Sequence, residues 1–308
     1  MQSFKSILVD IDATASVHPA LERAVRLARK CGARLTIIDV MTVPTYARRY
    51  LPTEVEEEMV GRRREQLANV ARGLLGVPSE SKLLIGRPAT VIIQEILRSQ
   101  HDLLMRSHAR DVAVSGSKPF GAIDMELLRK CPCPVFLVRP GGEGRTPQIL
   151  GTVNTNTDDA AEQALNTKIV ELTLLMALLE EGSPILLQAW APFAEGTVGL
   201  HVSADAFAAY VEDARRHTAG DLETFAASFG SRLADVQTIL RRGEPEEVIP
   251  EFTVAQAIDL VVMGAVGRAG IAGMLIGNTA ERVVRKLPCS VLAVKPDGFV
   301  CPVHLDAE

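Results

Sequence analysis

The segment Leu260-Val-Val-Met-Gly-Ala-Val-Gly267, followed after nine residues by Gly277-Asn-Thr279, tells most about the fold and function of this chain. Its first four residues form an apolar run that predicts a short buried strand, and residues 279–286 have the pattern of a helix. Glycines between a strand end and a helix start let backbone N–H groups approach a phosphate, and the helix N-terminus adds partial positive charge. The segment therefore predicts a phosphate-binding loop, although it follows neither of the two commonest glycine-rich patterns.

The same residues also allow a purely structural interpretation. Asn278 and Glu281 have the spacing of a capping box, in which two side chains satisfy the first N–H groups of a helix. Gly264 and Gly267 could simply shape a turn. On these residues alone both interpretations stay open.

Composition indicates a folded protein of two domains. The chain has 308 residues, of which 47% are hydrophobic and 23% charged, with a formal net charge of −5. This length suggests two domains, and the charge gives no reason to expect binding to nucleic acid or to an anionic membrane. Five cysteines in so long a chain favour a reducing compartment. With no signal-peptide pattern at the start and no apolar run long enough to span a bilayer, we expect a soluble, cytoplasmic protein.

The chain repeats itself at an offset of about 157 positions. Gly86-Arg-Pro-Ala-Thr-Val-Ile92 matches Gly243-Glu-Pro-Glu-Glu-Val-Ile249, and residues 127–140 match residues 283–296. Between the copies, residues 141–147 are rich in glycine and end in proline, as a linker would be. We therefore predict two versions of one domain, at residues 1–140 and 148–308.

Short apolar strands alternate with amphipathic helices within each copy. This order predicts an α/β fold with a parallel sheet covered by helices on both faces. In the first copy we expect strands at 6–10, 35–41, 82–85, 103–106 and 135–138, and helices at 18–31, 54–75, 90–99 and 121–130.

These features resemble the universal stress protein family. The resemblance rests on the two copies, on the Gly264-x-x-Gly267-x9-Gly277-Asn278 spacing, and on Leu275-Ile-Gly-Asn-Thr-Ala-Glu281 and Val294-Lys-Pro-Asp297. The chain is similar in particular to the family subtype that has two domains in one chain. The resemblance implies two Rossmann-like domains, each a five-stranded parallel sheet of strand order 3-2-1-4-5. It also implies that many members bind ATP through the glycine motif, whereas members without the motif bind none.

The strand order places a crevice at the carboxyl ends of strands one and four. The resemblance implies that an adenine nucleotide, with Mg²⁺ as a candidate companion, binds there in the second domain. The residues expected to take part are Asn154, Ala189, Gly264, Val266, Gly267, Arg268, Gly277, Asn278 and Thr279. Two of them depart from the family pattern, because Asn154 replaces an aspartate and Asn278 replaces a serine or threonine.

The first domain lacks the phosphate-binding pattern. Ser107 and Arg110 stand where the second domain has Gly264 and Gly267, and Ala122-Ile123 replaces the polar pair at the helix start. Asp12 stands at the family's aspartate position. We therefore predict that the first domain binds no nucleotide.

Other chemical signals favour ordinary structural roles. We interpret Cys131 and Cys133 as small buried packing residues, and His101 and His108 as exposed loop residues. Arg62-Arg-Arg64 follows several glutamates on one helix, so a solvated face is favoured over nucleic-acid binding. No catalytic or metal-binding constellation can be argued from the sequence.

The sequence thus predicts a stress-response protein that senses a nucleotide and is not an enzyme beyond slow ATP hydrolysis at most. The alternative is a binding module for an apolar or lipid-like ligand, which would use the apolar stretch at residues 193–207. The resemblance also implies that the domains pair through their last strands within the chain, and the whole chain could dimerise further.

Overall fold

The structure is a computed structural model of the whole chain. It describes residues 3–44, 46–74, 76–107, 120–140, 144–265 and 277–305. Val266, Gly267, Arg268, His108 and Arg110, which the sequence analysis singled out, lie outside the described residues.

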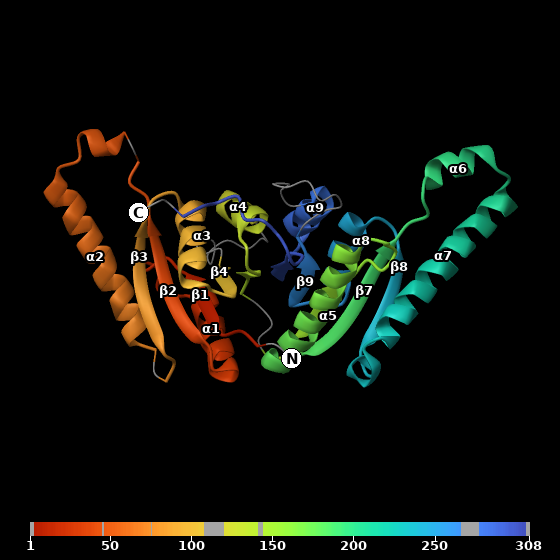
Figure 1. Cartoon of the computed structure of the whole chain (residues 1–308), viewed down its shortest axis with the longest axis horizontal. Coiled ribbons are helices and arrows are strands. Elements are labelled where there is room, and N and C mark those ends of the chain that lie inside the picture. The colour runs from red at the N-terminus through yellow and green to blue at the C-terminus, as the bar shows by residue number, and fades with distance from the viewer. Residues whose placement is uncertain are drawn as a thin grey trace.

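One continuous sheet runs through the molecule, in the strand order β3-β2-β1-β4-β5-β10-β9-β6-β7-β8 (Figure 1). Neighbouring strands are parallel except β5 and β10, which pair antiparallel with Phe136 opposite Leu292. The predicted α/β fold with two five-stranded parallel sheets of order 3-2-1-4-5 is confirmed. The strands are β1 (Ser6–Asp10), β2 (Arg34–Met41), β3 (Ser79–Ile85), β4 (Leu103–Ser107), β5 (Val135–Val138), β6 (Gln148–Thr152), β7 (Ser183–Trp190), β8 (Gln237–Arg242), β9 (Leu260–Gly264) and β10 (Ser290–Val294).

Helices cover both faces of this sheet. One apolar core holds Leu21, Leu67, Leu165 and Leu222 of α1, α2, α5 and α7, and the other holds Ile92, Leu127, Ile249 and Val283 of α3, α4, α8 and α9. The helices are α1 (Pro19–Cys31), α2 (Thr53–Arg72), α3 (Pro88–Ser99), α4 (Ala122–Lys130), α5 (Ala160–Glu180), α6 (Glu195–His201), α7 (Ala204–Ala227), α8 (Pro245–Ala255) and α9 (Asn278–Lys286), with 3-10 turns η1 (Ala47–Arg49) and η2 (Gly230–Leu233). None of the helices described is both long enough and apolar enough to cross a bilayer.

Burial on both faces explains why the central strands are almost wholly apolar. All five residues of β1 and of β10 are buried. Close packing also selects a glycine at position 151 in β6, because a Cβ there would lie 2.4 Å from Thr173 Oγ1 of α5. The sheet and its helices thus form a rigid base for the loops at the strand ends.

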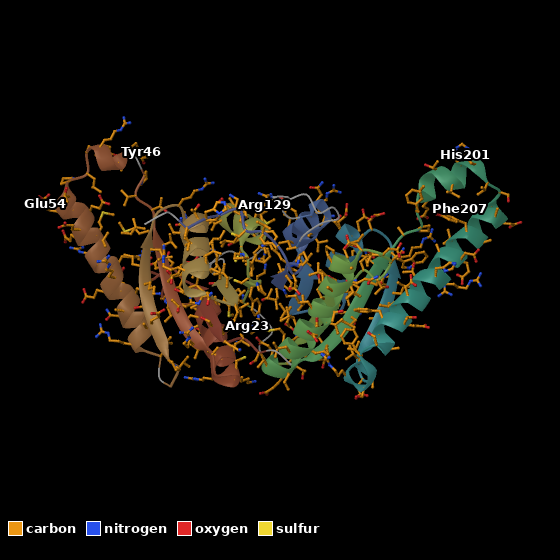
Figure 2. All side chains as sticks on the ribbon, in the orientation of Figure 1. Arg23, Tyr46, Glu54, Arg129, His201 and Phe207 are labelled. Atoms are coloured by element: carbon orange, nitrogen blue, oxygen red, sulfur yellow. The ribbon has the colours of Figure 1, made fainter. Side chains whose placement is uncertain are left out.

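The two halves of the chain are joined by more than the β5–β10 pair. Arg23 of α1 donates to Glu180 Oε1 of α5 (2.7 Å) and to Ser290 Oγ (3.1 Å), and its guanidinium lies 4.6 Å from the Phe136 ring centroid (Figure 2). The C-terminal segment crosses back to the N-terminal half, where Gln94 Nε2 donates to His304 O (3.2 Å).

Residues 193–207 differ from the loop that the sequence suggested, because they include helix α6. The ring of Phe207 packs against Gly199, where a Cβ would lie 3.3 Å from Phe207 Cε2. Phe193 and Leu200 are 88% and 83% exposed, before and within α6, which lies at one end of the molecule (Figure 1). Local packing therefore accounts for Phe207 but not for the exposed Phe193 and Leu200.

Candidate functional site

The candidate site of the C-terminal half lies where β6 and β9 end side by side. These neighbouring strands are parallel, with Gly151 opposite Val262, and their following helices α5 and α9 cover opposite faces of the sheet. Such a divergence opens a crevice at the carboxyl ends of the strands. Asn154, Ala189 and Gly264 lie at or just beyond the ends of β6, β7 and β9, as predicted.

Helix α9 begins at this crevice, and no described residue accepts the N–H groups of its first turn. Gly277 precedes the helix, and its N–H donates to Ala265 O (3.1 Å) just beyond β9. No described side chain caps the helix, and Asn278 and Thr279 are exposed. The N–H groups of a first turn have no partner within a helix, so an anion placed at this helix start would be stabilised.

The capping box suggested by the sequence does not form. Asn278 is the first residue of α9 rather than its cap, and the Glu281 carboxylate turns away to accept from Arg129 Nη2 (2.6 Å) and Arg285 Nη2 (2.7 Å). Both arginine donors carry a full positive charge, so these bonds add ion pairing to the hydrogen bond that a backbone N–H would supply. The hydrogen bonds from Arg129 and Arg285 lower the pKa of Glu281, which remains an anion held by two cations. Its charge is therefore already neutralised and does not occupy the helix end.

Two side-chain amides hold the loop that follows β6. Asn166 of α5 bonds both backbone groups of Asn154, accepting its N–H (3.0 Å) and donating to its oxygen (2.7 Å). Gln188 of β7 accepts from the backbone N–H of Thr155 (3.2 Å) and from its hydroxyl (2.8 Å). Gln188 is 1% exposed, and its Nε2 has no hydrogen-bond partner among the described residues. A buried donor without an acceptor lowers the stability of the folded state. Such a donor marks a place where an acceptor atom, from a ligand or a water molecule, would be stabilised.

The matching crevice of the N-terminal half is a hollow of about 810 Å³ between the ends of β1, β2 and β4 and the helices α2 and α4. Here the third residue of α4 places a carboxylate at the helix start, where Asp124 Oδ2 accepts the N–H of Gly121, the residue before the helix (2.9 Å). The other oxygen of Asp124 accepts from Arg106 Nε (2.8 Å), and Arg106 also pairs with Asp10. The start of α4 thus carries the negative charge of its own aspartate, whereas the acidic residue nearest the start of α9, Glu281, is bound by Arg129 and Arg285.

A second ion pair in this crevice was missed by the sequence analysis. Arg63 of α2 pairs with Asp39 and with Asp12 (3.0 Å to Oδ1). The interpretation of the basic run on α2 as a solvated face is confirmed for Arg62, which pairs with Glu58 on the same exposed face, but it is wrong for Arg63. No local pattern reveals Arg63, because its partners come from β2 and from the loop after β1.

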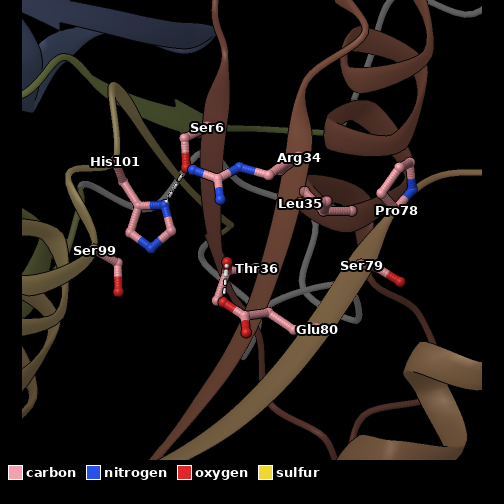
Figure 3. Close-up of a pocket in the computed structure, with 9 residues that line it drawn as sticks. All are labelled: Ser6, Arg34, Leu35, Thr36, Pro78, Ser79, Glu80, Ser99 and His101. Carbon is pink, nitrogen blue, oxygen red and sulfur yellow. Dashed lines mark hydrogen bonds between the residues drawn. The ribbon is translucent and has the colours of Figure 1, made fainter.

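The N-terminal half has a further hollow, of about 420 Å³, at the amino ends of its strands (Figure 3). Its lining residues are Ser6, Arg34, Leu35, Thr36, Pro78, Ser79, Glu80, Ser99 and His101. The prediction that His101 is exposed is wrong, since it is only 6% exposed. The turn after α3 directs the His101 ring inward, where Nδ1 lies 2.8 Å from Ser6 Oγ.

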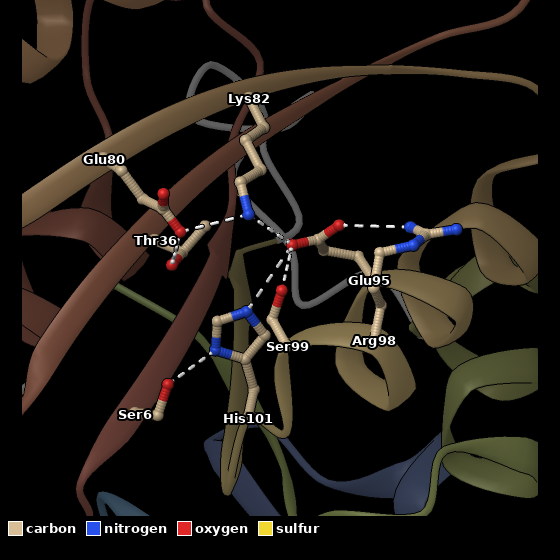
Figure 4. A network of polar contacts seen from close by, with 8 residues as sticks. All are labelled: Ser6, Thr36, Glu80, Lys82, Glu95, Arg98, Ser99 and His101. Carbon is tan, nitrogen blue, oxygen red and sulfur yellow. Dashed lines mark hydrogen bonds and ion pairs between the residues drawn. The ribbon is translucent and has the colours of Figure 1, made fainter.

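A polar network surrounds His101 (Figure 4). Glu95 accepts from Lys82 Nζ (2.8 Å) and from Ser99 Oγ (2.8 Å), and it lies 3.9 Å from His101 Nε2. Burial lowers the pKa of His101, so the ring stays neutral near pH 7. Across the described residues, no group of three or more His, Cys, Asp or Glu side chains is arranged to hold a metal ion.

Comparison with known proteins agrees with this architecture. The profile of the Universal stress protein family matches residues 3–139 and 153–295. Universal stress protein E of Salmonella typhi is 31% identical over 325 residues, with 100% of this chain and 99% of the relative covered. The protein of the same name from Photorhabdus laumondii is 30% identical over 322 residues, with 100% of both chains covered.

Solved structures show the same fold across both halves. A protein of unknown function from Pseudomonas aeruginosa PAO1 superposes with a TM-score of 0.70 at 24% identity, covering 96% of this chain and 94% of that one. A universal stress protein from Archaeoglobus fulgidus gives 0.66 at 14% identity, covering 96% and 98%. The family profile matches the chain twice and the relatives align along its whole length, so the chain belongs to the universal stress protein family.

Proposed function

We propose that this protein is a cytoplasmic stress-response module that binds ATP or a related adenine nucleotide in the crevice of its C-terminal half. The observation that carries the proposal is the open first turn of α9, beside the end of β9. Gly277 has no side chain to cap the helix, and the third helical residue is Ala280 rather than an acid. Phosphate groups suit such a helix end because both its N–H groups and its dipole favour negative charge.

The opposite side of the crevice suits the nucleoside. Ala189 and the buried Gln188 lie at the end of β7, and the side chain of Asn154 makes no hydrogen bond to a described residue. A purine ring offers nitrogen acceptors that the orphan Gln188 Nε2 would satisfy. Mg²⁺ would enter with the phosphates, because it is commonly held by phosphate oxygens with few protein ligands.

Binding, rather than turnover, is the activity that these side chains support. Asn154 and Gln188 donate and accept hydrogen bonds but are amides, so neither can act as a general base. The role of the protein would then follow from a difference in nucleotide affinity between two conformational states that partners distinguish.

The proposal is tested by calorimetric titration of the full chain with ATP, together with Gly277→Asp and Gly277→Asn. Aspartate and asparagine cap a helix about equally well, so the two variants differ mainly in charge at the phosphate position. We expect binding by the unmutated chain and by Gly277→Asn, and a loss of at least about tenfold in affinity for Gly277→Asp relative to Gly277→Asn. Absence of binding by the unmutated chain, or equal affinity of the two variants, would refute the proposal.

The exposed Phe193 and Leu200 support the alternative of an apolar or lipid-like ligand. Titration with a fatty acid, with Phe193→Ser/Leu200→Ser as the matched variant, separates this function from nucleotide binding. Binding of the fatty acid that is lost in the double variant, with no response to ATP, would favour the alternative.

A further inference from the structure

Three cysteines and one lysine gather at the seam between the two halves. Cys131 and Cys133 lie between α4 and β5, with their sulfur atoms 3.6 Å apart. Cys301, on the C-terminal segment, directs its thiol to Lys130 O (3.3 Å). Lys295, just after β10, donates to Cys131 O. Burial of Cys131 and Cys133 agrees with a packing role, but packing alone does not account for the lysine beside them.

Lys295 is an unusual residue to bury. It is 4% exposed, no carboxylate of the described residues lies within 4 Å of its amine, and the Phe299 ring centroid is 4.5 Å from Nζ. Burial lowers the pKa of Lys295, while the thiols of Cys131, Cys133 and Cys301 act in the opposite direction. A buried ammonium without a carboxylate is stabilised when a neighbouring group becomes an anion, and thiols are the acids available here.

The two thiols of the pair are not equivalent. Burial raises the pKa of Cys131, but the hydrogen bond from Cys133 and the charge of Lys295 outweigh it and bring this pKa below its ordinary value. The pKa of Cys133 is raised well above its ordinary value by the same hydrogen bond and by burial. The arrangement therefore favours a Cys131 thiolate that accepts a hydrogen bond from the Cys133 thiol.

The C-terminal half provides an internal contrast. Cys289 occupies the repeat position that corresponds to Cys133, but Leu287 stands where the first half has Cys131. Burial raises the pKa of Cys289 to about 12, so this thiol stays protonated and is a poor nucleophile near neutral pH. The dithiol is thus a property of one half, and it lies under the C-terminal segment that carries Phe299 and Cys301.

We propose that Cys131 and Cys133 form a reversible dithiol–disulfide pair that reacts with hydroperoxides, and that Lys295 is a positioning residue that stabilises the reacting thiolate. The Cys131 thiolate attacks the terminal peroxide oxygen, the O–O bond breaks, and the departing hydroxide or alkoxide takes a proton to become water or an alcohol. Cys133 sulfur then attacks the resulting sulfenic acid, its proton leaves with the hydroxyl group as water, and the S–S bond forms. The two thiols supply the two electrons, and an added thiol reductant reverses the reaction.

The test treats the reduced full chain with hydrogen peroxide, blocks the remaining thiols with an alkylating agent, and maps the peptides by mass spectrometry. We expect a product that lacks two hydrogen atoms in the peptide containing Cys131 and Cys133, restored by dithiothreitol. Cys31→Ser and Cys289→Ser serve as controls and should react like the unmutated chain. Absence of this product, or equal oxidation of all five cysteines, would overturn the proposal.

Three variants separate the role of Lys295 from simple packing. We expect Lys295→Met to slow disulfide formation by at least about tenfold, because the charge that favours the thiolate is gone, and Lys295→Arg to recover most of the rate. In Cys133→Ser the reaction should stop at a sulfenic acid on Cys131, which dimedone traps. This variant keeps Lys295, so its result does not depend on whether the Lys295 variants fold. Oxidation of Lys295→Met at the unmutated rate, or dimedone labelling spread over the other cysteines, would contradict the assignment.

Discussion

The two crevices of this protein share one backbone plan and differ in what occupies the start of the following helix. In the N-terminal half the third residue of α4 is Asp124, whose carboxylate accepts the N–H of the preceding glycine (2.9 Å). In the C-terminal half the third residue of α9 is Ala280, and the nearby Glu281 is held away by Arg129 and Arg285. The two copies of one repeated fold therefore differ in charge at the start of this helix, with a carboxylate bonded there in the first copy and none bonded there by the described residues of the second.

A second pair of corresponding residues, Asp39 and Gln188, also differs in whether its polar groups are satisfied within the protein. Asp39 and Gln188 both hold the loop after the first strand of their half, through the N–H of Ala13 (3.1 Å) and of Thr155 (3.2 Å). The aspartate is neutralised by Arg63, whereas the glutamine keeps an unpaired Nε2. Internal ion pairs therefore satisfy the first crevice, and the second retains a group that still needs a partner.

The largest effect is expected from breaking the internal pairing of the first crevice. Arg63→Met leaves the buried Asp39 without its cation and should lower the free energy of unfolding by about 2–4 kcal/mol in urea denaturation. Arg62→Met is the matched control, because it breaks an exposed i,i+4 pair with Glu58 and should cost less than about 0.5 kcal/mol. Equal losses for the two variants would mean that the crevice pair is not buried as described.

The next largest effect is expected at Ala280, which stands in α9 where α4 has Asp124. Ala280→Asp installs in α9 the carboxylate that α4 carries, and it should weaken ATP binding by about thirtyfold, or roughly 2 kcal/mol, in calorimetry. Ala280→Asn has nearly the same size without the charge and controls for crowding at this buried position. If both variants bind equally, the charge at this helix end does not set the difference between the halves.

The His101 network predicts a pH dependence of stability that arises in the N-terminal half. Burial lowers the pKa of His101, so its contribution to stability is present above its unfolded pKa of about 6.5 and is lost as pH falls, because the unfolded chain binds a proton that the folded chain resists. His101→Gln should flatten the fall in unfolding free energy between about pH 7 and 5.5, by at most about 1.4 kcal/mol per pH unit. The corresponding residue of the other half is the apolar Ile258, so Ile258→Leu should leave the slope unchanged. An unaltered slope in His101→Gln would contradict the assignment.

The smallest effect concerns how Glu281 is kept from the helix end. Arg129→Met removes one of its two cations and should weaken ATP binding by about threefold, since Arg285 still holds the carboxylate. Arg282→Met removes a positive charge from α9 itself but breaks only the exposed pair with Glu246, so it should change the affinity by less than about twofold. Indistinguishable affinities of the two variants would exclude a specific role for Arg129.

Periodicity and the internal repeat predicted the fold well because both are written along the chain. The apolar runs of β1 and β10 are buried on both faces, the repeat predicted two copies of one domain, and the family resemblance implied the strand order of each copy. The helix boundaries fell within a few residues of the prediction. Helix α6 was missed because its short apolar segment lacks the length and periodicity on which such predictions depend.

The chemistry of the crevices was only partly predictable. The positions of Asn154, Ala189, Gly264 and Gly277 at strand and helix ends follow from local pattern. The choice of Glu281 between the helix cap and Arg129 depends on a contact between residues 152 positions apart, which spacing cannot reveal. Arg63 and His101 were misjudged for the same reason, because their partners come from other elements.

Photolabelling with azido-ATP, followed by peptide mapping of the full chain, tests most directly whether only the open crevice binds a nucleotide. The account predicts a label near Gln188-Ala-Trp190 that excess ATP suppresses, and none on the peptides that carry Asp39 or Asp124. Labelling of the N-terminal crevice, or labelling that ATP does not suppress, would contradict it.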